Sequence, residues 1–86
     1  MAKYKISIKS TAAKELEDIP KKELRKIIKR IQSLAENPRA QGAQKLSGQE
    51  QYRVRQGDYR IVYSIKDKDR IIDIVKIGHR REIYRS

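Results

Sequence analysis

Apolar residues recur along the chain at two different spacings, and each spacing predicts a different kind of element. Over residues 24–35 they recur at every third or fourth position, which is the period of a helix with one face turned to a core. Pro20 suits the first turn of this helix, and Asn37 should end it because a residue before proline avoids the α region. The apolar positions are Leu24, Ile27, Ile28, Ile31, Leu34 and Ala35.

The residues before this helix predict a strand followed by a shorter helix. Residues 3–9 alternate lysines with apolar side chains, as in a strand with one half-buried face. Ser10 and Thr11 then offer side-chain oxygens that can cap a helix N-terminus, and this helix should end near Ile19. The two helical segments therefore form a hairpin.

The second half of the chain predicts strands. Residues 39–51 hold glycines, glutamines and one apolar anchor, Leu46, and are expected to form a loop. Runs rich in β-favouring residues follow at 52–56, 59–66 and 70–77. Their short connections require antiparallel neighbours. Residues 78–86 are expected to be irregular or a short final strand.

Together these elements predict an α+β fold for a single domain that spans residues 1–86. It should contain an N-terminal strand, a two-helix hairpin and then an antiparallel sheet of three or four strands. The helices should cover one face of the sheet and leave its basic face open.

Three arginines of the hairpin at residues 52–63 should lie on one exposed face. Arg53 and Arg55 are two apart in a strand, so they point to the same side, while Val54 points to the other. Arg60 can join them after the turn. Three guanidiniums repel one another, and an anionic partner explains why they converge. Phosphate is the leading candidate because the guanidinium fork matches it bidentately.

Composition narrows the classes of partner. The 86 residues carry a formal net charge of +11 and include no cysteine. This charge favours a polyanion, most commonly nucleic acid, and the lack of cysteine excludes disulfides and thiolate metal sites. No apolar run reaches the length of a signal sequence or a membrane span, so a soluble, cytoplasmic protein is expected. A membrane-surface protein is disfavoured because the arginines lie on predicted strands.

The carboxylates are too scattered for a metal-dependent nuclease, so neither a metal nor another cofactor is expected. Metal-assisted cleavage of a phosphodiester needs clustered carboxylates, and only Asp67 and Asp69 are closely paired, in a predicted solvated turn. RNA could instead be cleaved by its own 2′-hydroxyl, while the protein neutralises charge and moves protons. The candidate proton-moving groups are His79, the sole histidine, and Tyr84.

Four features of the chain point in the same direction. They are the order of the elements, the KLSG step at residues 45–48, the YRVRQGDYRIVY hairpin at residues 52–63 and the closing IGHRREIYR at residues 77–85. Over nearly the whole chain they resemble the RelE toxins of the RelE/ParE toxin–antitoxin superfamily. The resemblance implies a toxin that enters the ribosomal A site and cleaves mRNA there through 2′-hydroxyl attack. It also implies a cognate RelB-like antitoxin that neutralises the toxin in a hetero-oligomeric complex.

The resemblance further implies roles for individual residues. Arg53 and Arg55 match two basic positions that are typically lysines in RelE toxins, and Arg60 matches an arginine that stabilises the phosphate. Arg80 matches a second active-site arginine, and Tyr84 matches a tyrosine that orients or activates the attacking hydroxyl.

Arginine at both strand positions removes a plausible general base, because a guanidinium effectively never loses its proton. His79 therefore becomes the more attractive proton carrier. The predicted catalytic residues are Arg53, Arg55, Arg60, His79, Arg80 and Tyr84. The basic residues predicted to contact RNA are Lys45, Arg81, Arg85, Lys21, Lys22 and Arg25.

Other interpretations stay open. A ParE-type toxin shares the fold but acts on DNA gyrase without cleaving RNA. A non-catalytic RNA-binding module would keep its affinity after loss of His79 and Tyr84. The hairpin arginines could also be an ordinary solvated sheet face. The hairpin tyrosines, Tyr52, Tyr59 and Tyr63, share no side with the arginines and are expected in the core or at its edge.

Overall fold

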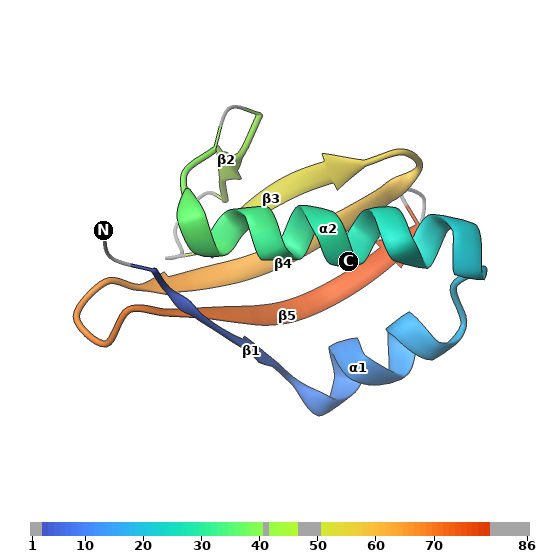
Figure 1. The fold of residues 1–86 in the computed structure, drawn as a ribbon, viewed down its shortest axis with the longest axis horizontal. Coiled ribbons are helices and arrows are strands. Elements are labelled where there is room, and N and C mark those ends of the chain that lie inside the picture. The colour runs from blue at the N-terminus through green and yellow to red at the C-terminus, as the bar shows by residue number, and fades with distance from the viewer. Residues whose placement is uncertain (1–2, 41, 47–50, 80–86) are drawn as a thin grey trace.

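One mixed β-sheet carries two helices, and the longer helix lies across a single face of that sheet (Figure 1). The computed structural model describes residues 3–40, 42–46 and 51–79. Within them the strands follow the spatial order β1-β5-β4-β3-β2. The elements are β1 (Lys5–Ile8), α1 (Ser10–Glu17), α2 (Lys21–Glu36), β2 (Gln44–Lys45), β3 (Gln51–Gln56), β4 (Tyr59–Lys66) and β5 (Ile71–His79).

The predicted α+β class is confirmed. Over the described residues the sheet has five strands, whereas an antiparallel sheet of three or four strands was predicted. β3, β4 and β5 are antiparallel neighbours, as predicted. β1 joins the sheet in parallel with β5, which makes the sheet mixed. At the other edge β2 pairs with β3, so the prediction of a loop over residues 39–51 is wrong at Gln44–Lys45.

The hydrophobic core lies between α2 and the sheet face that α2 covers, called here the helix face. α2 contributes Ile27, Ile31 and Leu34, which are buried and spaced three and four residues apart. Fully burying one such side chain contributes about 1.5–3 kcal/mol, so this apolar stripe fixes how α2 lies on the sheet. The fully buried sheet residues of the core are Val54, Ile61, Tyr63, Ile72, Ile74 and Ile77.

The helix ends agree with the sequence pattern only in part. The predicted capping role of Ser10 and Thr11 is wrong, because α1 begins at Ser10 with Lys9 as N-cap and without a side-chain cap hydrogen bond. The end of α2 is as predicted, since the chain leaves the helix at Asn37, before Pro38. Neither helix in the described residues is long and apolar enough to cross a membrane.

A β-bulge in β5 interrupts the alternation of its side chains. Val62 pairs with Lys76 and Tyr63 pairs with Ile74, so Val75 is an extra residue between two regular stretches of the ladder. Because of this insertion, the apolar residues on both sides of the bulge face the core.

β5 continues beyond the end of its pairing with β1. The N–H of Ile77 there donates to Oε1 of Glu15 on α1, with an N···O distance of 2.9 Å. Gly78 and His79 extend the strand, and the predicted irregular tail after them lies outside the described residues. α1 thus completes the hydrogen bonding of β5 where no strand is adjacent.

A group of polar contacts, called here the Arg39–Asp67 clamp, joins four parts of the chain. Arg39 makes a bidentate ion pair with Asp67, with N···O distances of 2.8 and 3.2 Å. The hydroxyl of Tyr4 donates to Oδ1 of Asp67 at 2.7 Å, and Nε of Arg39 donates to the hydroxyl of Tyr52 at 3.2 Å. Asp67 lies in the predicted turn, but it is ion-paired there and not merely solvated. The clamp ties the segment after α2 to the β4–β5 turn.

The clamp predicts a specific loss of stability in acid. Its hydrogen bonds from Arg39 and then Tyr4 lower the pKa of Asp67 from 3.8 to about 2. Because the pKa is lower in the folded state, the carboxylate stabilises the fold at neutral pH and loses this effect as the pH falls from about 4 to 2. Asp67→Asn should therefore flatten the fall of the urea midpoint between pH 5 and pH 2.5. The control is Asp69→Asn in the same turn; an equal change in both variants would contradict a role for the clamp.

Candidate functional site

The pairing of β3 with β4 brings the three hairpin arginines to one side of the sheet. Arg55 lies opposite Arg60 and Arg53 lies opposite Val62, and directly opposite residues of an antiparallel pair share a face. This side, called here the arginine face, is the reverse of the helix face. The hairpin tyrosines lie on the helix face, where Tyr63 is fully buried and Tyr52 and Tyr59 pack partly buried against the core, as predicted.

The arginines line a hollow of about 390 Å³, called here the arginine groove. Arg55 is exposed and Arg53 is partly buried, whereas Arg60 is only 7% exposed. The expectation of three exposed arginines is therefore wrong for Arg60. An arginine does not shed its proton even when buried, so Arg60 supplies a fixed positive charge with little freedom to move.

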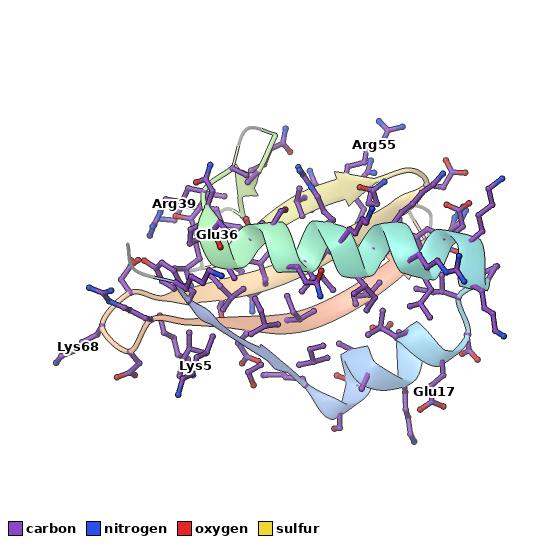
Figure 2. All side chains as sticks on the ribbon, viewed as in Figure 1. Lys5, Glu17, Glu36, Arg39, Arg55 and Lys68 are labelled. Carbon is purple, nitrogen blue, oxygen red and sulfur yellow. The ribbon has the colours of Figure 1, made fainter. Side chains whose placement is uncertain are left out.

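Two of the arginines are held by hydrogen bonds that the structure defines. Nη2 of Arg53 donates to Oε1 of Gln44 at 2.9 Å, and Nε of Arg55 donates to the carbonyl of Gly57 at 3.1 Å. Figure 2 shows Arg55 projecting outward from β3, far from Arg39 at the other end of α2. The remaining wall of the groove is Gly42. No described residue in the lining is a carboxylate, so the groove presents concentrated positive charge to an anion.

His79 lies at the rim of this region and not in the arginine groove. It is exposed and pairs with Tyr59 across β4 and β5, with the two rings edge to face and their centroids 5.7 Å apart. Arg60 pairs with Gly78, so His79 points to the opposite face of the sheet from Arg60.

A second hollow, of about 430 Å³, joins His79 to the arginines through Arg55. Both residues line it, together with Tyr59, Gly57, Asp58 and Glu23. Arg55 lines both hollows and so lies between the arginine groove and the histidine. The structure therefore brings Arg53, Arg55 and Arg60 together and places His79 beside only one of them.

The other predicted RNA-contacting residues lie in separate places. Lys21, Lys22 and Arg25 are exposed on the first turns of α2. Lys45 pairs with Tyr52, so it belongs to the reverse side of β2 from Gln44 and the arginines. The predicted residues Arg80, Arg81, Tyr84 and Arg85 lie outside the described residues.

The sequence did not point to the uncharged residues that line the groove, Gly42 and Gln44, or to the Arg39–Asp67 clamp. Gly42 has φ +92°, a left-handed conformation that favours glycine. The presence of a glycine here was the only sequence feature that indicated a turn beside the groove. Nothing in the sequence indicated the role of Gln44, because a two-residue strand is too short to show a periodicity. In the part of the chain that the structure describes, no three histidine, aspartate or glutamate side chains gather to hold a metal ion.

A family model decides the class of protein. The model described as the ParE toxin of the type II toxin–antitoxin system, parDE, matches residues 6–84. The chain belongs to the RelE/ParE family of toxins. Within this family it is 34% identical to a candidate toxin RelE1 of Methanocaldococcus jannaschii, over 98% of each chain. It is 32% identical to toxin RelE of Mycobacterium tuberculosis, over 95% of this chain and 87% of that one.

Solved structures of RelE/ParE toxins share the fold. The archaeal RelE–RelB complex from Pyrococcus horikoshii matches with a TM-score of 0.82 and 32% identity, over 91% of this chain and 96% of that chain. The RelBE2 complex of Mycobacterium tuberculosis gives a TM-score of 0.82 at 22% identity, over 91% of this chain and 99% of that one, and shows the fold alone. These likenesses confirm the predicted family and the predicted RelE-like architecture.

The arginine groove should bind a simple oxyanion. We expect inorganic phosphate to raise the melting temperature more than sodium chloride of equal ionic strength does. At a concentration ten times Kd, a ligand that binds only the folded state stabilises it by about 1.4 kcal/mol. Arg55→Ala should reduce this rise. Lys68→Ala removes the same charge from the β4–β5 turn, far from the groove (Figure 2), and should not reduce it. Equal losses in both variants would mean that phosphate binds without regard to the groove.

Proposed function

We propose that this member of the RelE/ParE family is a metal-independent, ribosome-dependent mRNA endoribonuclease that cleaves in the A site and inhibits translation. The observation that carries this function is the arginine groove, in which three guanidiniums share one face without a carboxylate in the described lining. Such a groove suits a phosphodiester whose negative charge increases during the reaction.

In this mechanism the 2′-hydroxyl of one nucleotide attacks the adjacent phosphorus. The bond from phosphorus to the 2′-oxygen forms, the bond to the 5′-oxygen of the next nucleotide breaks, and a 2′,3′-cyclic phosphate remains. The phosphorane between these states carries more negative charge than the substrate does. Arg60, which is nearly buried, supplies a fixed positive charge, and Arg53 and Arg55 bind the phosphate oxygens.

The protons need a different group, because arginine does not release one at neutral pH. The 2′-hydroxyl must lose a proton and the departing 5′-oxygen must gain one. His79 is the proposed proton carrier among the described residues, because it shares a hollow with Arg55. RNA that passes over the β3–β4 turn would reach both residues. Arg80 and Tyr84 remain part of the proposed catalytic set through the family resemblance.

Ribosome binding is proposed to use the exposed basic residues at the start of α2. Lys21, Lys22 and Arg25 can contact RNA phosphates, which would increase affinity without reading sequence. Lys45, Arg81 and Arg85 are proposed as further RNA contacts.

A RelB-like antitoxin is the proposed protein partner. Support comes from the solved relatives, because the toxins of Pyrococcus horikoshii and Methanococcus jannaschii were each crystallised in a complex of RelE with RelB. A second candidate function is a ParE-type toxin that acts on DNA gyrase, and the description of the matching family model favours it. The arginine groove favours RNA cleavage, since a gyrase poison does not need to stabilise a phosphorane.

Primer extension on a defined mRNA, translated in a reconstituted system, tests this function. The wild-type chain should cut within the A-site codon only when ribosomes are present. Arg55→Ala should slow cleavage by roughly 100-fold, which is the usual cost of removing one donor to a developing oxyanion. Arg60→Lys keeps a charge at the nearly buried position but loses the bidentate fork, so it should also be slow. Lys68→Ala is the control for loss of a distant charge. Growth inhibition in cells without any cut would favour the gyrase-directed function.

Replacement of His79 tests the proton carrier separately. His79→Ala should slow single-turnover cleavage by roughly 100-fold or more, as expected for loss of a general acid or base. Binding to ribosomes should change little, because the arginines and the α2 cations remain. Association with ribosomes by sedimentation provides this second readout. A single-turnover rate equal to that of the wild type would make His79 a bystander.

A further inference from the structure

An uncharged side chain shares the arginine groove with the three guanidiniums. Gln44 of β2 lies directly opposite Arg53 of β3, so both side chains project from the arginine face. Oε1 of Gln44 accepts a hydrogen bond from Nη2 of Arg53, with an N···O distance of 2.9 Å. Gln44 also lines the groove itself. It therefore contacts the arginine at the edge of the space that a phosphodiester would occupy.

The three arginines of the groove are held in different ways. Arg55 donates to the backbone carbonyl of Gly57. The backbone of the hairpin turn provides this acceptor, so it does not depend on a side chain of the turn. Arg60 is held by burial, with 7% of its surface exposed. Arg53 lies between these cations and β2. Repulsion from the other guanidiniums and the rotamer entropy of a long side chain both favour its release toward solvent.

An amide oxygen suits the task of holding a cation that must also bind phosphate. A carboxylate would bind the guanidinium more strongly, but it would cancel the charge and repel an incoming anion. The amide of Gln44 engages one of the five N–H donors of Arg53 and leaves its full positive charge in place.

The backbone that carries Gln44 is fixed from outside the groove. The N–H of Leu46 donates to the carbonyl of Gln51 at 2.8 Å, which closes the short β2–β3 ladder. On the other side, the Arg39–Asp67 clamp holds the start of the segment. Gln44 is therefore presented to Arg53 by a segment that has its own anchors at both ends.

We propose that Gln44 is a positioning residue that orients the guanidinium of Arg53 toward the scissile phosphodiester. It acts through Arg53 and does not touch the reacting atoms. This role rests on the proposed function, RNA cleavage in the arginine groove.

A double-mutant cycle on cleavage tests the role. Gln44→Met removes the acceptor oxygen and keeps the length of the side chain. It should slow single-turnover, ribosome-dependent cleavage roughly tenfold, the effect of losing one hydrogen bond to a charged group. In an Arg53→Ala background the same substitution should change the rate by less than about twofold, because no guanidinium remains to be oriented. Gln56→Met, on the helix face of β3, is the matched control and should leave the rate unchanged.

Arginine side-chain NMR gives a second readout that does not depend on cleavage. Rotation of the Arg53 guanidinium should be hindered in the wild-type chain and fast in Gln44→Met, while the Arg55 signal and the melting temperature stay unchanged. An Arg53 signal that is indifferent to Gln44, or an equal loss of rate with and without Arg53, would overturn the role. Absence of cleavage by the wild-type chain would overturn the proposed function and this role with it. The NMR signal distinguishes the two failures, because it reports the contact even in an inactive toxin.

Discussion

The register between β3 and β4 is the constraint on which the rest of the molecule depends. Side chains of a strand alternate between two faces, so a slip of one residue would exchange every one of them. In the observed register, Val54 and Ile61 face α2, while Arg55 and Arg60 face the other way. The same alternation thus produces the core and the groove. Because the hydrophobic face must be buried, it also fixes the face of the sheet from which the arginines project.

The segment between α2 and β3 turns this charged face into a groove. β2 extends the sheet by two residues and brings Gln44 beside Arg53. The Arg39–Asp67 clamp fixes the same segment at the far end of the sheet, and a buried hydrogen bond from the hydroxyl of Tyr63 to the carbonyl of Pro38, at 2.7 Å, adds to it. The ion pair that helps to fix this segment therefore lies outside the groove. This separation suits a charged site, because strong ion pairs inside it would compete with the ligand.

The sequence predicted what local periodicity controls. α2, the β3–β4 hairpin, the shared side of Arg53, Arg55 and Arg60, and the opposite side of the tyrosines all follow from spacings of two or of three and four. Features that depend on distant partners were not predictable in this way. The parallel pairing of β1 with β5 and the ion pair of Arg39 with Asp67 each join segments that carry no common signal.

The candidate site shows the same limit. The burial of Arg60 depends on what surrounds it in three dimensions, and alternation within a strand does not report that. The position of His79 was equally out of reach, because it depends on where β5 breaks its alternation. The sequence did not predict β2, because a strand of two residues is too short to show a period.

The β-bulge of β5 determines more than the local shape of the strand. With Val75 as an extra residue, Gly78 lies opposite Arg60, and His79 lies opposite Tyr59. An unbroken ladder continued from Ile74 would instead place Ile77 opposite Arg60 and bring a branched apolar side chain to the arginine face. The number of residues in β5 between Ile74 and Ile77 therefore determines which residue lies opposite Arg60. Inserting one residue there while a single bulge is kept would place Ile77 instead of Gly78 opposite Arg60, at a distance from the altered position and without changing any of the arginines.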